Sequence, residues 1–256
     1  MEIWKTNRLC SQKSNQKIKL KIKMGFKSEY HNLKRLFYRK LYLSSKKEKS
    51  IIDQFHIMYY DSFLFGKTWA ESTFMGTHIK KFPFDTWIYQ EMLYELKPDL
   101  IIECGTYKGG NALYLACLLD FMNKGEIISI DIVDYENKPK HPRITYLTGS
   151  TVAPEILKVL DERSKNKESV LVILDDDHTR DHVLNEMHIY SKYVTKGNYM
   201  IVEDSNVNGH PVFPEFGPGP YEAIEDFMKI NREFEIDKSR EKFYMTANPN
   251  GYLKKK

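Results

Sequence analysis

Residues 99–111, DLIIECGTYKGGN, decide the fold that this chain is expected to adopt. A short apolar strand leads into Glu103 and then into a glycine-rich turn that contains Gly105 and Gly109. In the segment that follows, at 112–122, apolar residues recur at the three- and four-residue spacing of a helix. Strand, glycine turn and helix together predict the first half of a nucleotide-binding βαβ unit.

The turn also indicates which cofactor it holds. A dinucleotide-binding turn reads G-x-G-x-x-G, whereas this one places Tyr107 near the second glycine position, where its bulk disfavours a pyrophosphate. Glu103 would repel a phosphate but attract the ammonium group of an amino-acid moiety. About 20 residues later a second strand ends at Asp131, which is placed to accept hydrogen bonds from a ribose diol. The pattern E-x-G-x-x-x-G-G resembles the first motif of class I S-adenosylmethionine-dependent methyltransferases.

A further strand extends this α/β pattern. The segment RITYLTGS predicts a third strand that ends at Ser150, where an adenine ring is commonly contacted. The sequence therefore predicts a Rossmann-like fold with a mostly parallel central sheet and helices on both faces. Residues 232–253 are expected to form a closing pair of strands, and the last three lysines a solvated tail.

Length and composition suit one α/β domain with an extension. The 256 residues are 41% apolar, which supplies a sizeable core. Cys10, Cys104 and Cys117 show no metal-ligand spacing, which favours a reducing, cytoplasmic setting. No apolar run approaches the length of a membrane-spanning helix.

Charge is distributed unevenly along the chain. Residues 1–50 contain 15 Lys/Arg and 3 Asp/Glu, a net charge of +12, whereas the remainder is acidic. Within this basic N-terminal extension, 1–27 is expected to be an arm or a weak edge strand, and 28–42 a helix with an apolar face. The helix is expected to dock on another part of the assembly, on a second copy in a homo-oligomer, or on the anionic inner surface of a membrane. Nucleic acid is not an expected partner, because the folded remainder is acidic.

The segment 51–98 is expected to be a helical cap that precedes the methyltransferase domain at 99–256. A helix is predicted at 51–65, and a second one after Asp85, whose side chain is suited to an N-terminal cap. Lys80 is one residue of this segment that can reach a ligand.

Two clusters of carboxylates follow apolar strands further along the chain. Asp175, Asp176 and Asp177 follow the apolar strand SVLVIL, and Glu203–Asp204 end a further strand in the segment NYMIVEDSN. The carboxyl ends of parallel strands share one edge of a sheet, so these side chains are expected to converge there and to need a cation. Oxygen ligands of this kind suit Mg²⁺ or another divalent ion. His178 lies close enough to act as a general base on a substrate hydroxyl.

From about residue 68 to residue 254, the chain resembles the family named for cephalosporin hydroxylase, which includes rhamnosyl and macrolide-sugar O-methyltransferases. The stretches that carry the resemblance include YQEMLYELKPDLIIECGTYKGGNAL, VLVILDDDH, IVEDSNVNGHPV and FGPGPYEAI. The resemblance implies a methyltransferase that uses S-adenosylmethionine and a divalent metal to methylate a hydroxyl of a sugar, lipid-linked sugar or glycosylated metabolite.

The same resemblance implies roles for individual residues. Asp175, Glu203 and Asp204 match the metal ligands, with Asp177 as an alternative to Asp175, and His178 matches the base. The expected cofactor-binding residues are Glu103, Gly105, Tyr107, Gly109, Asp131, Ser150 and Asp175.

The histidines and aspartates of the chain also bear on other possible functions. None of the eight histidines has Asp or Glu two residues later, which argues against an iron oxygenase. Asp175 and Asp177 form a D-x-D pattern that would suit a glycosyltransferase using Mn²⁺ and a nucleotide sugar. A non-enzymatic subunit with a degenerate fold is the remaining alternative.

Overall fold

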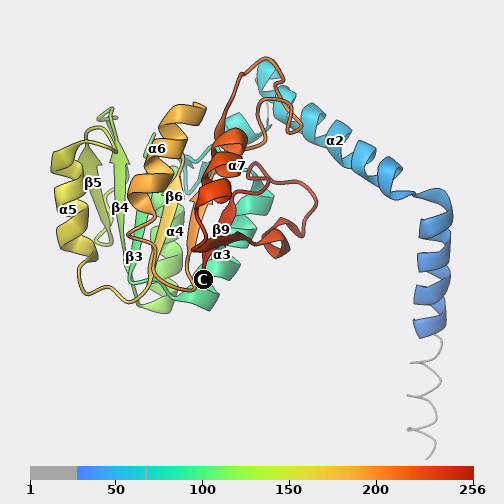
Figure 1. The fold of residues 1–256 in the computed structure, drawn as a ribbon, viewed down its shortest axis with the longest axis horizontal. Helices are drawn as coiled ribbons and strands as arrows, with labels where there is room; N and C mark the ends of the chain where they lie inside the picture. Colours follow the sequence, from blue (N-terminus) through green and yellow to red (C-terminus); the bar gives the residue numbers. More distant parts are fainter. Residues whose placement is uncertain (1–27, 67) are drawn as a thin grey trace, which may run out of the picture. The chain divides into compact units, whose positions relative to one another are not determined.

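The computed structural model describes residues 28–66 and 68–256 (Figure 1). The chain divides into two compact units, one up to Ile52 and one from Asp53 to Lys256. In the first unit residues 28–42 are helical, as predicted, and the apolar side chains of Leu33, Leu36, Phe37 and Leu41 are exposed. The arm or edge strand expected at 1–27 lies outside the described residues.

The segment before the sheet is helical, but its boundaries differ from those expected. Helix α2 (Ser45–Asp61) begins before residue 51 and is followed by the 3₁₀ helices η1 (Ser62–Phe65) and η2 (Thr68–Glu71). A small antiparallel pair, β1 (Thr73–Phe74) and β2 (Thr77–His78), then leads towards α3 (Pro83–Leu96).

The second unit is built on a seven-stranded sheet with the order β5-β4-β3-β6-β7-β9-β8. Five neighbouring strands are parallel: β3 (Leu100–Cys104), β4 (Glu126–Asp131), β5 (Ile144–Thr148), β6 (Val170–Leu174) and β7 (Tyr199–Val202). Strand β9 (Tyr252–Lys255) runs antiparallel to both β7 and β8 (Phe234–Ile236). The predicted mostly parallel sheet is therefore confirmed, with β3 and its glycine turn near the centre.

Alternating strand residues send their side chains to opposite faces of this sheet, and each face has its own core. Leu100 and Ile102 pack with helices α5 (Pro154–Ser164), α6 (Arg180–Tyr190) and α7 (Pro220–Ile230). Ile101 packs on the other face with α3 and α4 (Gly110–Met122). Helices thus cover both faces, as predicted (Figure 1).

Two local predictions are wrong. Helix α3 begins at Pro83, so Asp85 lies inside its first turn and is buried instead of capping it. A proline is well suited to the first turn of a helix because its missing N–H has no partner to lose there. Lys254 and Lys255 are not in a solvated tail, since β9 pairs them with Tyr199 and Phe234.

Among the described residues, no helix is both long and apolar enough to cross a membrane. Cys104 and Cys117 are free thiols, and Cys104 is buried in the sheet.

Candidate active site

A cavity of about 710 Å³ opens at the carboxyl ends of the parallel strands. Its volume is in the range of small-molecule sites. Seven of the residues expected from the sequence line it: Gly105, Tyr107, Asp131, Ser150, Asp175, His178 and Asp204. Three expected residues do not line it: Glu103, Gly109 and Glu203.

The glycine turn lets β3 and β6 end side by side. Gly105 has φ +97°, and a Cβ at this position would lie 1.9 Å from the backbone oxygen of Asp175. A side chain would therefore push the turn away from the end of β6. Gly110 is equally confined, because its Cβ would meet the backbone oxygen of His78 at 2.1 Å. This close approach brings the segment that carries Lys80 and Lys81 to the cavity.

Asp131 is held at the end of β4 by two backbone donors. The N–H groups of Tyr107 and Val133 donate to its carboxylate oxygens at 2.8 and 2.9 Å. These bonds fix the carboxylate beside the glycine turn, where it borders the cavity. The Tyr107 ring lies 4.3 Å from the Lys80 ammonium, and both side chains line the same wall.

Glu103 lies beneath the cavity. It shares the strand face of Ile101, so its side chain points towards α4. There it accepts hydrogen bonds from Asn111 Nδ2 at 2.7 Å and from the Ser129 hydroxyl. Burial raises its pKa to about 7, although both hydrogen bonds act in the opposite direction. Its contribution to the site is to hold α4 against the glycine turn. Gly109 precedes α4 as its N-cap residue with φ +79°, and a Cβ there would meet Tyr146 and Pro139.

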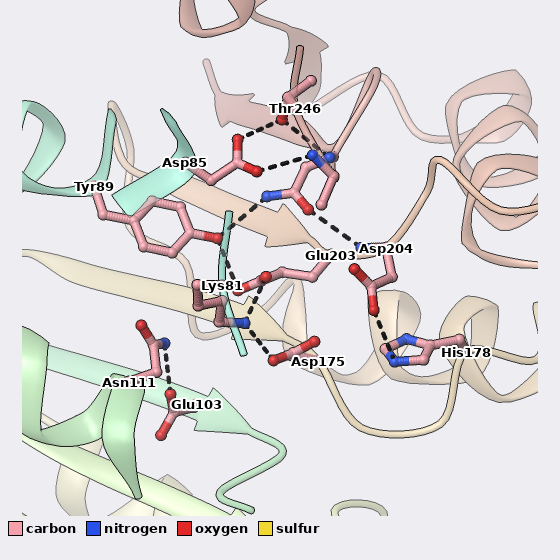
Figure 2. Close-up of polar contacts among 12 residues, drawn as sticks. Lys81, Asp85, Tyr89, Glu103, Asn111, Asp175, His178, Glu203, Asp204 and Thr246 are labelled. Carbon is pink, nitrogen blue, oxygen red and sulfur yellow. Dashed lines mark hydrogen bonds and ion pairs between the residues drawn. The ribbon is translucent and has the colours of Figure 1, made fainter. Parts of the chain in front are cut away.

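Lys81 also lines the cavity, and the sequence did not single it out. Its ammonium forms ion pairs with Asp175, at the end of β6, and with Glu203, at the end of β7 (Figure 2). The Lys81 side chain is 5% exposed and that of Glu203 is 2% exposed. Burial lowers the pKa of Lys81, but the two carboxylates raise it by more, so the ammonium stays charged.

Glu203 is also held from the opposite side by helix α3. The Tyr89 hydroxyl donates to Glu203 Oε1 at 2.7 Å and accepts from Asn248 Nδ2 at 3.2 Å. Asn248 Oδ1 in turn accepts from the N–H of Asp204 at 3.2 Å. Figure 2 shows this chain of contacts from Tyr89 to Asp204.

Asp85 anchors the same region to α3. It accepts from the Thr246 hydroxyl, the N–H of Ala247 and the Tyr252 hydroxyl. The segment that carries Asn248 is thereby fixed to α3, next to Tyr89.

The second group of candidate residues faces the cavity directly. His178 Nε2 lies 3.3 Å from Asp204 Oδ2. Ligand atoms of Asp175, His178 and Asp204 lie within 4.8 Å of one another, which would suit a cation. Burial lowers the pKa of His178, but Asp204 and Asp175 raise it by more. Asp204 adopts a left-handed backbone conformation with φ +52°, which turns it from the end of β7 towards His178.

The three consecutive aspartates have three different surroundings. Asp175 faces Lys81, whereas Asp177 is exposed and accepts from the N–H of Thr179 just before α6. Asp176 lies 3.1 Å from His182 Nε2, which also lies 3.5 Å from the buried Glu186. The hydrogen bond to Asp176 and the nearby carboxylate of Glu186 raise the pKa of His182 to about 10.

Comparison with known proteins places this site in a family. The sequence model described as "Rhamnosyl O-methyltransferase/CmcI" matches residues 66–256. The chain belongs to this family. A rhamnosyl O-methyltransferase of Mycobacterium tuberculosis is 38% identical over 228 residues, covering 85% of this chain and 87% of the relative. One from Mycobacterium leprae is 39% identical over 214 residues, covering 81% and 91%.

Solved structures of CmcI are similar in fold. An apo form has a TM-score of 0.56 at 21% identity and covers 73% of this chain and 76% of CmcI. A form described as containing Mg and SAM has a TM-score of 0.56 at 20% identity and covers 73% and 77%. The likeness confirms the predicted Rossmann-like class I methyltransferase fold.

Membership of the rhamnosyl O-methyltransferase/CmcI family identifies the chain as a methyltransferase enzyme. The glycosyltransferase and non-enzymatic alternatives are therefore set aside. Asp177 also lines the cavity, but it is not in the close group formed by Asp175, His178 and Asp204.

Proposed function

We propose that this protein transfers a methyl group from S-adenosylmethionine to a hydroxyl of a sugar, and that a divalent cation assists. The observation that carries the proposal is that one cavity is lined both by the Gly105–Tyr107 turn with Asp131 and by Asp175, His178 and Asp204. The first set suits a nucleoside with an amino-acid moiety, and the second suits a hydroxyl that must lose a proton.

The cofactor is proposed to lie across the ends of β3 and β4. Asp131 has acceptor capacity for ribose hydroxyls, and Ser150 and Thr151 line the part of the cavity suited to an adenine ring. The cavity has the volume that a ligand of this size needs. Glu103 supports the turn from below, so its proposed influence on the ammonium group is electrostatic.

His178 is proposed as the general base. Its imidazole takes the proton of the acceptor hydroxyl while the acceptor oxygen forms a bond to the methyl carbon and the carbon–sulfur bond breaks. The sulfonium donor leaves as a neutral thioether, and Asp204 stabilises the imidazolium that results. Positioning of the oxygen in line with the carbon–sulfur bond supplies much of the acceleration.

A divalent cation is proposed at Asp175 and Asp204, whose oxygens border the cavity together with His178. Glu203 remains a proposed ligand, although in this structure its carboxylate contacts Lys81 and Tyr89. When bound, the ion would lower the pKa of the acceptor hydroxyl and favour the neutral form of His178.

Rhamnosyl groups are the proposed class of acceptor, because the relatives at 38–39% identity are named for them. The test uses purified protein, S-adenosylmethionine with a labelled methyl group, and a rhamnosyl glycolipid with free hydroxyls. Label on a rhamnose oxygen supports the proposal, and its loss with EDTA supports the metal. Binding of S-adenosylmethionine without transfer of the labelled methyl group to the rhamnosyl glycolipid would refute the proposed acceptor class.

For the N-terminal segment we propose contact with an anionic membrane surface. Support comes from the net charge of +12 in residues 1–50 and the exposed apolar side chains of residues 28–42. Co-sedimentation with vesicles containing phosphatidylserine tests it. Binding that is equal with neutral vesicles would contradict the electrostatic part.

A further inference from the structure

The Lys81 ammonium occupies a position between carboxylates that would also stabilise a divalent cation. Its ammonium lies between Asp175 and Glu203, 2.5 Å from Glu203 Oε2 and in an ion pair with the Asp175 carboxylate (Figure 2). The two carboxylates end neighbouring strands, whereas Lys81 comes from the segment just before α3. Three separate parts of the chain therefore meet at one ammonium group.

The lysine is fixed in this position from both directions along the chain. Phe82, the next residue, is buried and precedes the Pro83 that starts α3. On the other side, the backbone of His78 and Ile79 packs against Gly110, where no side chain would fit. The Glu203 carboxylate is also fixed, because its other oxygen accepts from Tyr89. The ion pair is thus a built feature of the site and not a flexible side chain at a surface.

The carboxylates around Lys81 are the groups that a divalent cation would also bind. Asp175, Glu203 and Asp204 bring three carboxylates to the edge of the sheet, where Lys81 pairs with the first two and His178 lies beside the third. A divalent cation that binds between Asp175 and Glu203 must displace the ammonium or be repelled by it at close range.

We propose that Lys81 is an internal cation that competes with a divalent ion for Asp175 and Glu203. It lowers the affinity of the site for the ion and keeps the acidic strand ends together when no ion is bound. The inference rests on the proposed function, because it takes the divalent cation site of that proposal as given.

A purely structural role for Lys81 predicts the opposite sign. If the ammonium only holds the carboxylates in place for the ion, its removal would loosen the ligands and weaken ion binding. Competition predicts that removal strengthens ion binding while destabilising the ion-free protein, since the carboxylates of Asp175 and the buried Glu203 then repel each other.

The test compares Mg²⁺ binding by calorimetry in the full-length wild type, Lys81→Met and Lys80→Met. Methionine keeps the length and removes the charge. Lys80→Met is the matched control, because it makes the same change at a neighbouring lysine that also lines the cavity but faces Tyr107. We expect Lys81→Met to bind Mg²⁺ at least about tenfold more tightly, and Lys80→Met to stay within about threefold of wild type. Equal or weaker binding by Lys81→Met would overturn the inference.

A measurement on the wild type covers the case in which Lys81→Met does not fold. Reductive methylation with formaldehyde, followed by peptide mass spectrometry, reports how accessible the Lys81 amine is. In EDTA we expect strong protection, and with saturating Mg²⁺ an increase in labelling of at least about fivefold as the ammonium is displaced from its carboxylates. Unchanged or lower labelling would overturn competition.

Failure of this inference and failure of the proposed function give different results. If the wild type and Lys81→Met bind Mg²⁺ equally, the metal proposal stands and the competition does not. If none of the folded proteins binds Mg²⁺, the metal part of the proposed function fails, and the inference with it. Binding of S-adenosylmethionine in the same samples tests the cofactor proposal independently.

Discussion

Replacing Tyr89 with phenylalanine tests whether the buried chain of polar contacts behind the cavity stabilises the fold. Tyr89, Glu203 and Asn248 are each at most 2% exposed, so water does not take the place of the lost hydroxyl. The change removes a hydrogen bond to a carboxylate, worth about 1.5–3 kcal/mol, and leaves an Asn248 donor unpaired at a cost of about 1 kcal/mol. Phenylalanine keeps the ring packing, so we expect a total destabilisation of about 2–4 kcal/mol.

The assay is urea unfolding at pH 7 in EDTA, followed by circular dichroism and by intrinsic fluorescence. Tyr94→Phe is the matched control on the same helix, because Tyr94 is 71% exposed, and we expect it to stay within about 0.5 kcal/mol of wild type. A Tyr89→Phe variant as stable as the control would refute the reasoning, since it would mean that Glu203 gains nothing from this hydroxyl.

Four further variants, one of them a control, test the glycine turn, the general base and the His182 contacts. Gly105→Ala is expected to lower stability by more than about 3 kcal/mol and S-adenosylmethionine affinity by at least about tenfold, because its Cβ would overlap the backbone of Asp175. Gly197 also has positive φ, but no described residue lies within 4 Å of an added Cβ, so Gly197→Ala should lower stability by only about 1 kcal/mol. Equal losses of stability in the two variants would contradict the steric argument. His178→Ala should reduce methyl transfer by roughly 10²–10⁴ while retaining cofactor binding by calorimetry, and a near-normal rate would remove it as the base. His182 has a folded-state pKa raised from 6.5 to about 10, so its stabilising effect is fully present below pH 6.5 and is lost as pH rises to about 10. Because its side chain is partly exposed, the gap in unfolding free energy between wild type and His182→Gln should be about 1–2 kcal/mol at pH 6 and vanish near pH 10; a gap that does not change with pH would argue for packing alone.

Local patterns in the sequence were sufficient to predict the centre of the fold. The strand–turn–helix unit at 99–122 depends on apolar periodicity and glycines within one short stretch, and the structure confirms it as β3, Gly105 and α4. The convergence of Asp175, His178 and Asp204 was also predictable, because parallel strands place their carboxyl ends at one edge.

Contacts between distant segments explain what the sequence analysis missed. Nothing in the sequence around Lys81 indicates that it pairs with Asp175 and Glu203. The three residues meet because the segment before α3 packs against the glycine turn. The three donors to Asp85 come from residues 246–252, far along the chain. The sequence near Asp85 therefore indicated only a helix cap. Glu103 was expected at the cofactor, but it shares the strand face of Ile101 and points towards α4. The sequence does not say which helix covers that face.

The proposed function requires that this cavity moves a methyl group onto a sugar oxygen. The most direct measurement is mass spectrometry of sugars from cells that carry the gene, cells that lack it, and cells complemented with wild type or His178→Ala. We expect a sugar that loses one methyl group without the gene and regains it with wild type but not with His178→Ala. Sugars with identical methylation in all four samples would contradict it.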